Sequence, residues 1–408
     1  MIAIFAAIAV TIPGVALRLL GTHADPGVEA FVYGVCILGA AFLLTWASEV
    51  AQMDIAQGLA LAFLALIAVL PEYAVDLYFA WEAPHRPEYT SYATANMTGA
   101  NRLLIGIAWP LIIVLYWFKT GERVLQLPGE RTVELVFLAA ATVYSFVIPF
   151  KGTISLLDTL VLVGLFIGYM WRIAQAEAEE PHLVGPAAVL GKLAPVPRRT
   201  LVLIFFAYGA GAILASAEPF AEALIHTGKD LGVEEFLLVQ WLAPFASEAP
   251  EVVIACILTL KGDAQAGMGA MISSKVNQWT LLIGTLALVY SISLGGPGAL
   301  HLDDRQMEEI LLTAAQSAFA VAVLCNMSLS LGEAFALFFL FVAQLLLPLF
   351  FSDPKAGIHA RFLFSFAYVF LAAIMIFVRR KDLPKFFRTG LGIAGMEHER
   401  EATGKPGE

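Results

Sequence analysis

Two stretches of sequence decide the fold: LPEYAVDLYFAW at residues 70–81 and APEVVIACILTL at residues 249–260. Each places a Pro-Glu pair inside an apolar run. Each is followed by a second run dotted with polar residues, ATANMTGANRLLIG at 93–106 and MISSKVNQWTLLIG at 271–284. The Pro-Glu pairs lie 179 residues apart and the LLIG segments 178 apart, so a one-residue gap relates the copies. The chain therefore contains an internal repeat.

The composition around these stretches is that of a membrane protein. The 408 residues are 59% hydrophobic and 14% charged, against about 25% charged for a soluble domain. A spanning helix needs about 20 mainly apolar residues. The hydropathy pattern predicts about twelve, an all-α polytopic fold, at 2–20, 27–48, 55–81, 92–118, 132–150, 154–171, 201–225, 236–260, 268–294, 310–325, 333–351 and 362–378.

The repeat sets the arrangement of these helices. Each copy comprises five spans, and an odd-numbered unit repeated in tandem enters the membrane from opposite sides, so we expect two inverted repeats. The boundaries follow from this: an extra helix at 1–26, the first repeat at 27–172, a central cytoplasmic loop at 173–200, the second repeat at 201–351, and a last helix with a basic cytoplasmic tail at 352–408. We expect the first helix to be retained, because its apolar run is longer than that of a signal peptide.

The distribution of basic residues predicts the orientation. Arg102 and Lys275 lie inside predicted helices, and most of the other Lys and Arg residues, fifteen, fall on the side of the two termini. The opposite side has seven: Arg18, Arg86, Lys151, Lys229, Arg305, Lys355 and Arg361. Since cytoplasmic loops are enriched in positive charge, both termini are expected on the cytoplasmic side. We expect the protein in the cell (inner) membrane. The sequence leaves the oligomeric state open, a homo-oligomer included.

Several function classes are disfavoured. The net charge of −10 argues against a nucleic-acid partner. The three cysteines form no CxxC pair, and all seven histidines fall outside the apolar runs, so a zinc site or a catalytic dyad inside the membrane is not expected. The sequence has no GxxxxGK[ST] phosphate loop. We expect no enzyme and no cofactor, and transport driven by an ion gradient.

Four acidic residues are the strongest functional candidates. Glu72 and Asp76 share one face of the first Pro-Glu helix, and Glu248 and Glu251 share one face of the second. A carboxylate in the middle of a membrane costs about 2.5–3.5 kcal/mol on insertion scales, so intramembrane acids mark ion pathways. Proline frees backbone oxygens beside each acid, and carboxylate and carbonyl oxygens suit hard cations such as Na⁺ and Ca²⁺. Structural bonding to a neighbouring helix is the alternative, stronger for Asp76 and Glu248.

Neutral oxygens and two basic residues accompany the acids. The candidates for completing a coordination shell are Asn96, Thr98, Asn101, Ser247, Ser273, Ser274 and Asn277, although small polar residues also serve as packing contacts between membrane helices. Arg102 and Lys275 need partners, and a structural salt bridge to one of the four acids is one interpretation of these two bases. Lys275 is a candidate tethered cation that takes the place of a mobile ion, and both bases are charge-compensating candidates.

The motifs resemble the sodium/calcium exchanger superfamily, the cation/calcium antiporters, whose repeats carry a G-T-S-x-P-E-like helix and a G-N-x-x-G-S-N-like helix. The matching pieces are Leu70-Pro71-Glu72 with Ala95-Asn96 and Gly99-Ala100-Asn101, and 247–251 with Ser273-Ser274. The resemblance implies ten core helices around a central ion site, with Glu72 and Glu251 as paired metal ligands and Asn96 as a further ligand. Ala68-Val69 and Ser247-Glu248 depart from the family's Thr-Ser, and Lys275 stands near an expected ligand position.

The leading hypothesis is therefore a secondary active antiporter that exchanges Na⁺ or H⁺ against Ca²⁺ or another cation. The alternative is Na⁺/H⁺ or Ca²⁺/H⁺ exchange with Lys275 as the tethered cation. An ion channel is disfavoured because the charges converge on kinked helices within one chain. A hydrolase is disfavoured because its only nucleophile and base, Ser247 and Glu248, are adjacent on a helix and face different ways.

Overall fold

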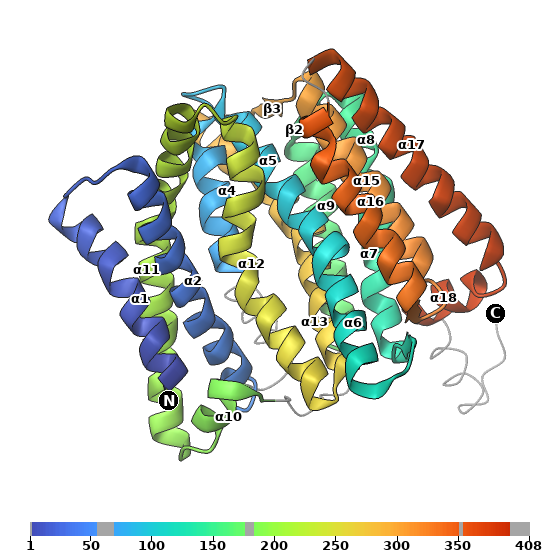
Figure 1. Cartoon of the computed structure of the whole chain (residues 1–408), viewed down its shortest axis with the longest axis horizontal. Helices are drawn as coiled ribbons and strands as arrows, with labels where there is room; N and C mark the ends of the chain where they lie inside the picture. Colours follow the sequence, from blue (N-terminus) through green and yellow to red (C-terminus); the bar gives the residue numbers. More distant parts are fainter. Residues whose placement is uncertain (1, 55–68, 176–182, 351–353, 392–408) are drawn as a thin grey trace.

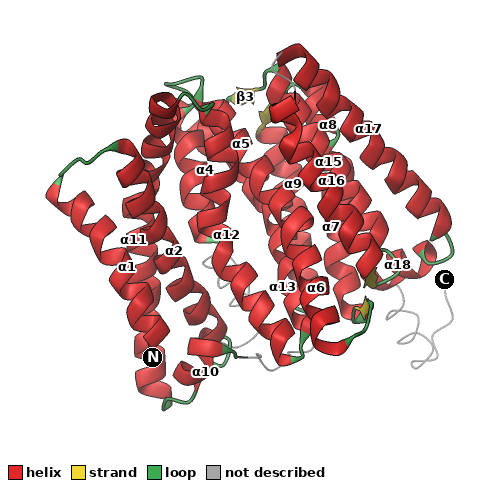
Figure 2. Cartoon of the chain, in the orientation of Figure 1, coloured by secondary structure: helices red, strands yellow, loops and turns green. Residues whose placement is uncertain are grey.

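The computed structural model describes residues 2–54, 69–175, 183–350 and 354–391. They form a bundle of long helices, coloured along the chain in Figure 1 and by secondary structure in Figure 2. In this part of the chain, ten helices are long and apolar enough to cross a membrane. The predicted all-α membrane fold is confirmed.

The chain begins with α1 (Ile2–Leu20), the extra helix expected before the first repeat. The first half then contains α2 (Pro26–Ala51), α4 (Leu70–Glu82), α5 (Tyr89–Leu103), the π-helix η1 (Leu104–Ala108), α6 (Trp109–Thr120), β1 (Val124–Gln126), η2 (Gly129–Arg131), α7 (Thr132–Ser145), α8 (Val147–Lys151), β2 (Thr153–Ser155) and α9 (Leu156–Ile173).

A short helix, α10 (Gly185–Gly191), leads into the second half. This half contains α11 (Pro195–Leu231), α12 (Glu235–Lys261), α13 (Ala264–Asn277), the π-helix η3 (Gln278–Leu282), α14 (Ile283–Leu294), β3 (Ala299–His301), α15 (Asp304–Leu324), β4 (Ser328–Ser330) and α16 (Leu331–Phe350). The chain continues through α17 (Pro354–Val378) to α18 (Leu383–Gly390).

The order of elements recurs in the two halves. In both, a π-helix interrupts the third long helix, one strand follows that helix, and a second strand follows the fourth. The strands pair between the halves: β1 lies antiparallel to β4, with Leu125 opposite Leu329, and β2 lies antiparallel to β3, with Ile154 opposite Leu300. The pairs lie at opposite edges of the bundle (Figure 2). They join the two halves at both ends of the helices.

Four predicted boundaries differ from the structure. The span expected at 55–81 is described only from residue 69, and α4 covers its second part. The region 173–200 is not only a loop, since α10 lies in it and α11 begins within it at Pro195. Proline is well tolerated in the first turn of a helix, so it can start α11 there. The helix expected at 132–150 is broken between α7 and α8. Beyond Val378, part of the basic tail folds as α18, whose Phe386 is buried.

Ion pairs join the segment after α2 to the first turns of α11. The guanidinium of Arg198 donates to both carboxylate oxygens of Asp54, at 2.7 and 2.8 Å, and Arg199 donates at 3.0 Å. These bonds, from Arg198 first, hold the pKa of the Asp54 carboxyl below its usual value. Figure 1 shows α1, α2 and α11 side by side at one edge of the molecule.

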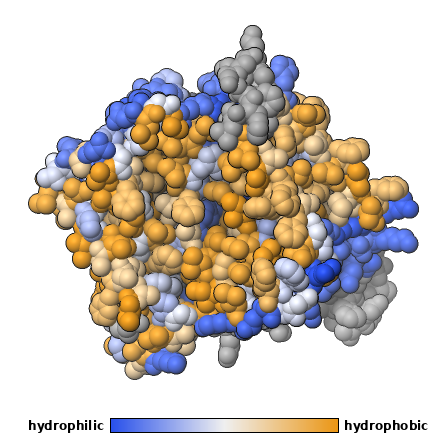
Figure 3. Space-filling model, viewed as in Figure 1, coloured by the Kyte–Doolittle hydropathy of each residue, from blue (hydrophilic) through white to orange (hydrophobic). Residues whose placement is uncertain are grey.

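The outer surface matches a lipid environment. Hydrophobic side chains dominate the face drawn in Figure 3, and hydrophilic ones gather mainly toward its upper and lower rims. Large apolar residues such as Phe150, Trp171, Leu203 and Phe370 are more than 60% exposed. The chain is an integral membrane protein, and an apolar exposed surface of this kind suits contact with lipid.

Two glycines let helices approach α12 closely. A Cβ added to Gly99 of α5 would lie 1.8 Å from the carbonyl oxygen of Gln240. A Cβ added to Gly267 of α13 would lie 2.7 Å from the carbonyl oxygen of Ala255. Because α5 and α13 carry polar residues and α12 carries the candidate acids Glu248 and Glu251, these approaches bring the polar segments close to those acids.

Candidate cation site

Three of the four predicted acids converge in the bundle. Glu72 of α4 and Glu248 and Glu251 of α12 each offer a carboxylate oxygen, and the three oxygens lie within 4.8 Å of one another. Glu72 and Glu248 are buried, and Glu251 is half-buried. Asp76 is fully buried one helical turn beyond Glu72 and lies outside this group of three. Acids 179 positions apart in the sequence thus meet across the two halves.

Proline shapes the helices that carry these acids. Pro71 lies in the first turn of α4 and starts that helix beside Glu72. Pro250 lies inside α12 between the two glutamates and provides no N–H for the carbonyl of Ala246, four residues earlier. Pro244 does the same one to two turns before. The backbone of α12 therefore has unpaired carbonyl oxygens close to its acids.

The site contains many oxygens without a hydrogen-bond donor. Among the described residues, the buried oxygens lacking a partner include both of Glu72, both of Asp76, Asn96 Oδ1, Glu248 Oε2, Glu251 Oε2, Asn277 Oδ1 and Gln278 Oε1. Buried polar atoms are nearly always hydrogen-bonded, so such a concentration needs an explanation. Hard cations bind this combination of carboxylate and amide oxygens.

The neutral candidates differ in their bonding. Asn96 is buried on α5 with Oδ1 unpaired. Ser247 Oγ donates within its own helix, at 3.3 Å, to the carbonyls of Ala243 and Pro244. Ser274 Oγ accepts a long bond of 3.4 Å from Gln278, and the same amide donates to Glu248. Asn96 and Asn277 are thus the neutral candidates whose side-chain oxygens are available.

Lys275 does not pair with the acids. Its ammonium donates to Asn101 Oδ1 at 2.6 Å and lies 4.3 Å from the ring centre of Trp279. A longer contact of 3.4 Å joins it to the Asn101 carbonyl. The interpretation of Lys275 as a structural salt bridge to one of the four acids is therefore wrong, since no acid of the described chain lies within ion-pair distance and Asn101 of the other half accepts its hydrogen bond. Lys275 still belongs to the electrostatic surroundings of Glu248.

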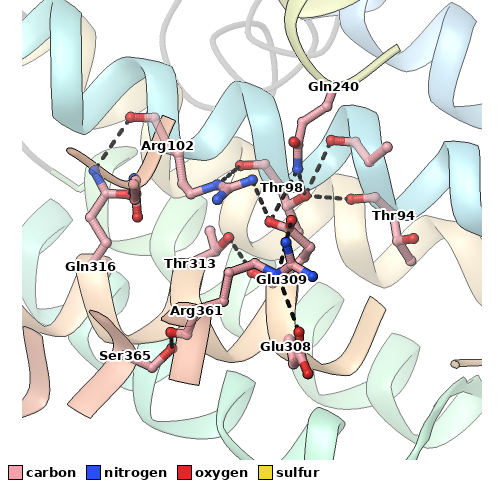
Figure 4. A network of polar contacts seen from close by, with 12 residues as sticks. Thr94, Thr98, Arg102, Gln240, Glu308, Glu309, Thr313, Gln316, Arg361 and Ser365 are labelled. Carbon is pink, nitrogen blue, oxygen red and sulfur yellow. Dashed lines mark hydrogen bonds and ion pairs between the residues drawn. The ribbon is translucent and has the colours of Figure 1, made fainter. Parts of the chain in front are cut away.

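The same interpretation is also wrong for Arg102. Arg102 forms an ion pair of 2.6 Å with Glu309, an acid of α15. Gln240 donates to the same carboxylate at 3.2 Å, and Arg361 of α17 lies 3.9 Å from its other oxygen and 3.1 Å from Glu308. Figure 4 shows this network joining α5, α12, α15 and α17. The three converging carboxylates have no ion pair with a basic residue in the described chain.

Sequence reasoning missed Gln278 and Glu309. Gln278 follows Asn277 and begins η3, and only its contact with Glu248 distinguishes it from a packing residue. Glu309 directly precedes the helix predicted from residue 310, where an acid reads as a solvated helix start. Its pairing with a buried arginine more than 200 residues away has no local signal.

The arrangement defines a class of protein: a membrane-embedded helix bundle with a cluster of acids, a candidate cation site, contributed by both of its halves. The model of the sodium/calcium exchanger protein family matches residues 28–174 and 201–350. The chain belongs to this family, whose members are transporters and not enzymes.

Solved structures agree with this assignment. The crystal structure of an H⁺/Ca²⁺ exchanger, CAX, is 42% identical, with coverage of 96% of this chain and 98% of that chain and a TM-score of 0.89. Native YfkE shares 14% identity over 83% of this chain and 98% of its own, with a TM-score of 0.63. The sodium-calcium exchanger NCX_Mj shares 17% identity over 78% and 97%, with a TM-score of 0.51. The last two show a shared fold alone. No curated protein matches the chain in a sequence comparison.

Proposed function

We propose that this protein is a secondary active antiporter that exchanges Ca²⁺ for H⁺ at the carboxylates of Glu72, Glu248 and Glu251. The observation that carries the proposal is the convergence of three acids, while the two intramembrane bases of the repeat helices, Lys275 and Arg102, are bonded elsewhere. A divalent cation needs at least two negative charges, and oxygen ligands at 2.3–2.6 Å suit Ca²⁺. The 42% identical structure is that of an H⁺/Ca²⁺ exchanger.

The charge balance favours protons as the counter-ion. When Ca²⁺ leaves, carboxylates buried in the bundle must gain compensating positive charge, since isolated buried charges are very costly. Protons provide that charge without a coordination shell. Sodium ions would each need several neutral oxygens, and Ser247 already bonds within α12. In each half-cycle, one Ca²⁺ therefore replaces two protons, and the net charge of the site is unchanged.

The residues of the site have different proposed roles in binding Ca²⁺. Glu72 and Glu251 take the central positions as direct ligands, and Glu248 contributes a third carboxylate. Asn96 supplies a neutral oxygen. Gln278 orients Glu248 through its amide donor, and Ser274 is a further neutral oxygen in contact with that amide. Ser247 is a weaker candidate because its hydroxyl is already bonded, and Arg102 and Lys275 act at a distance through their charge.

Flux in proteoliposomes tests the proposal. An imposed pH gradient should drive Ca²⁺ transport by the wild-type protein in the absence of Na⁺. Glu72→Gln and Glu251→Gln should each lower the transport rate at least 100-fold, because each substitution removes a charge but keeps the side-chain volume. Glu88→Gln, at an exposed loop position, is the matched control and should transport normally. Ca²⁺ flux that requires Na⁺ and ignores the pH gradient would overturn proton exchange in favour of Na⁺/Ca²⁺ exchange. Normal flux in either site variant would contradict the assignment of these carboxylates as the cation site.

A further inference from the structure

The two repeats do not contribute their acids symmetrically. Figure 1 shows α4 ending, and α12 beginning, at the same upper edge of the bundle, so the helices run antiparallel. Asp76 follows Glu72 by four residues, and Glu248 precedes Glu251 by three. At 1.5 Å per residue, Asp76 and Glu248 are displaced by about 6 Å and 4.5 Å from the central pair. Both displacements point the same way, toward the edge where α4 ends.

The counterparts of these two acids are apolar. Aligning the Pro-Glu pairs places Asp76 opposite Ala255 and Glu248 opposite Val69. Ala255 is fully buried and Val69 is 4% exposed. Both lie on the other side of the central pair, away from the end of α4. Two identical inverted repeats would provide acids on both sides, whereas this chain has them on one.

Asp76 has the properties of a ligand. Its side chain is fully buried, and within the described part of the chain neither carboxylate oxygen accepts a well-aligned hydrogen bond. The side-chain amide of Asn96 lies within hydrogen-bonding reach of it, and the oxygen of that amide is unpaired. No basic residue of the described chain forms an ion pair with Asp76, and one neutral amide compensates little of the cost of a buried carboxylate. These oxygens lie apart from the three that converge within 4.8 Å.

We propose that Asp76, with Asn96, forms a second cation position, displaced from the central pair toward the end of α4, on the side where Glu248 lies. This inference rests on the proposed function, since it takes Ca²⁺ as the transported ion. A cation arriving from the edge where α4 ends meets Asp76 before it reaches Glu72 and Glu251. A cation arriving from the opposite edge meets Val69 and Ala255 and has no such intermediate position. The affinity for Ca²⁺ is therefore higher at the α4-end face.

Sided transport measurements test the proposal. Right-side-out and inverted membrane vesicles expose opposite faces, so each gives the half-saturating Ca²⁺ concentration for one face. Asp76→Asn should raise this concentration about tenfold or more at the α4-end face, as expected for one lost charged ligand, and less than about twofold at the other. An equal change at both faces, or no change, would overturn the proposal.

An exchange of positions provides a sharper form of the test. Asp76→Ala combined with Ala255→Asp moves the extra acid to the symmetry-related position and should reverse the preference between the faces. If this double variant does not fold, as judged by size-exclusion chromatography and thermal stability, Asp76→Asn alone still decides the matter. A folded double variant that keeps the wild-type preference would contradict the inference.

Equilibrium binding of Ca²⁺ separates this inference from the proposed function. In Glu72→Gln/Glu251→Gln, weak Ca²⁺ binding should remain, and adding Asp76→Asn should abolish it. Loss of all binding in the first variant would overturn the second position but support the central site. Unchanged transport in Glu72→Gln would instead refute the proposed function, whatever Asp76 does.

Discussion

Arg102 and Lys275 are buried basic residues that meet the cost of burial in different ways. Arg102 has a carboxylate partner in Glu309 and stacks over Trp241, with 5.1 Å between its guanidinium carbon and the ring centre. Lys275 has an amide oxygen and an indole ring, and no carboxylate within ion-pair distance among the described residues. The first arrangement is a structural ion pair. The second leaves a buried amine without a carboxylate partner near Glu248 of the candidate cation site.

The Arg102–Glu309 pair should contribute strongly to stability. We expect Arg102→Met to lower the free energy of unfolding by about 3 kcal/mol, the lower end for breaking a buried pair, because Arg361 remains 3.9 Å from Glu309. Arg102→Met/Glu309→Gln should recover part of the loss. Thermal unfolding in detergent measures both effects.

The matched control for this pair is exposed. Arg18 and Glu218 form an ion pair of 2.5 Å, and their side chains are 45% and 49% exposed. Arg18→Met should cost less than about 1 kcal/mol, since exposed pairs contribute little. If Arg102→Met were no more destabilising than Arg18→Met, the buried network would have no special role in stability.

Sequence could predict the acids of the site but not their neighbours. Glu72, Asp76, Glu248 and Glu251 stand out because a carboxylate inside an apolar run is costly wherever the helix packs. The partners of Arg102 and Lys275 depend on which helices become adjacent, and that is a property of the assembled bundle. Asn101 satisfies Lys275 from the other half, and Glu309 satisfies Arg102 from α15. The local sequence around Arg102 and Lys275 gives no signal that identifies these partners.

At the scale of helices, close packing depends on residues that lack a side chain. Gly99 lies on α5 three residues after Asn96, so the contact it makes with α12 also sets the position of that amide. The sequence identifies the helix but not this contact. The same is true of η1 and η3, because a π-turn inserts one residue into an otherwise regular apolar pattern and leaves the periodicity almost unchanged.

Gly99→Ala should therefore damage both stability and transport. The added Cβ would lie 1.8 Å from the Gln240 carbonyl oxygen, so α5 and α12 must move apart. We expect a loss of about 1–3 kcal/mol, typical of overpacking, and a large decrease in Ca²⁺ affinity measured by calorimetry.

Gly211→Ala is the control for this variant. Gly211 lies inside α11, and its added Cβ would meet no atom within 4 Å. It should leave Ca²⁺ affinity unchanged and stabilise the helix by up to about 1 kcal/mol. Equal effects of the two substitutions would show that the approach of α5 to α12 does not matter for the site.

At the scale of the whole molecule, the orientation in the membrane is open to a direct measurement. Glu88 follows the end of α4, whereas Gly129 lies in η2, next to β1 at the opposite edge of the bundle; both residues are exposed. In a background with its three cysteines replaced, Glu88→Cys should react with an impermeant thiol reagent on intact cells. Gly129→Cys should react only after permeabilisation. Reaction of both from one side would contradict the predicted topology.

The strand pairs carry a further consequence for the chain as a whole. Strands β1 and β3 occupy the same place in the order of elements in their halves, and so do β2 and β4. Each pair joins one strand of the first kind to one of the second, so the two pairs are equivalent by exchange of the halves. A chain that held only one half would leave both of its strands unpaired. Both strands could be paired only by a second identical chain inserted in the opposite orientation. Each chain would then provide the partner strands for the other, as in an isologous dimer.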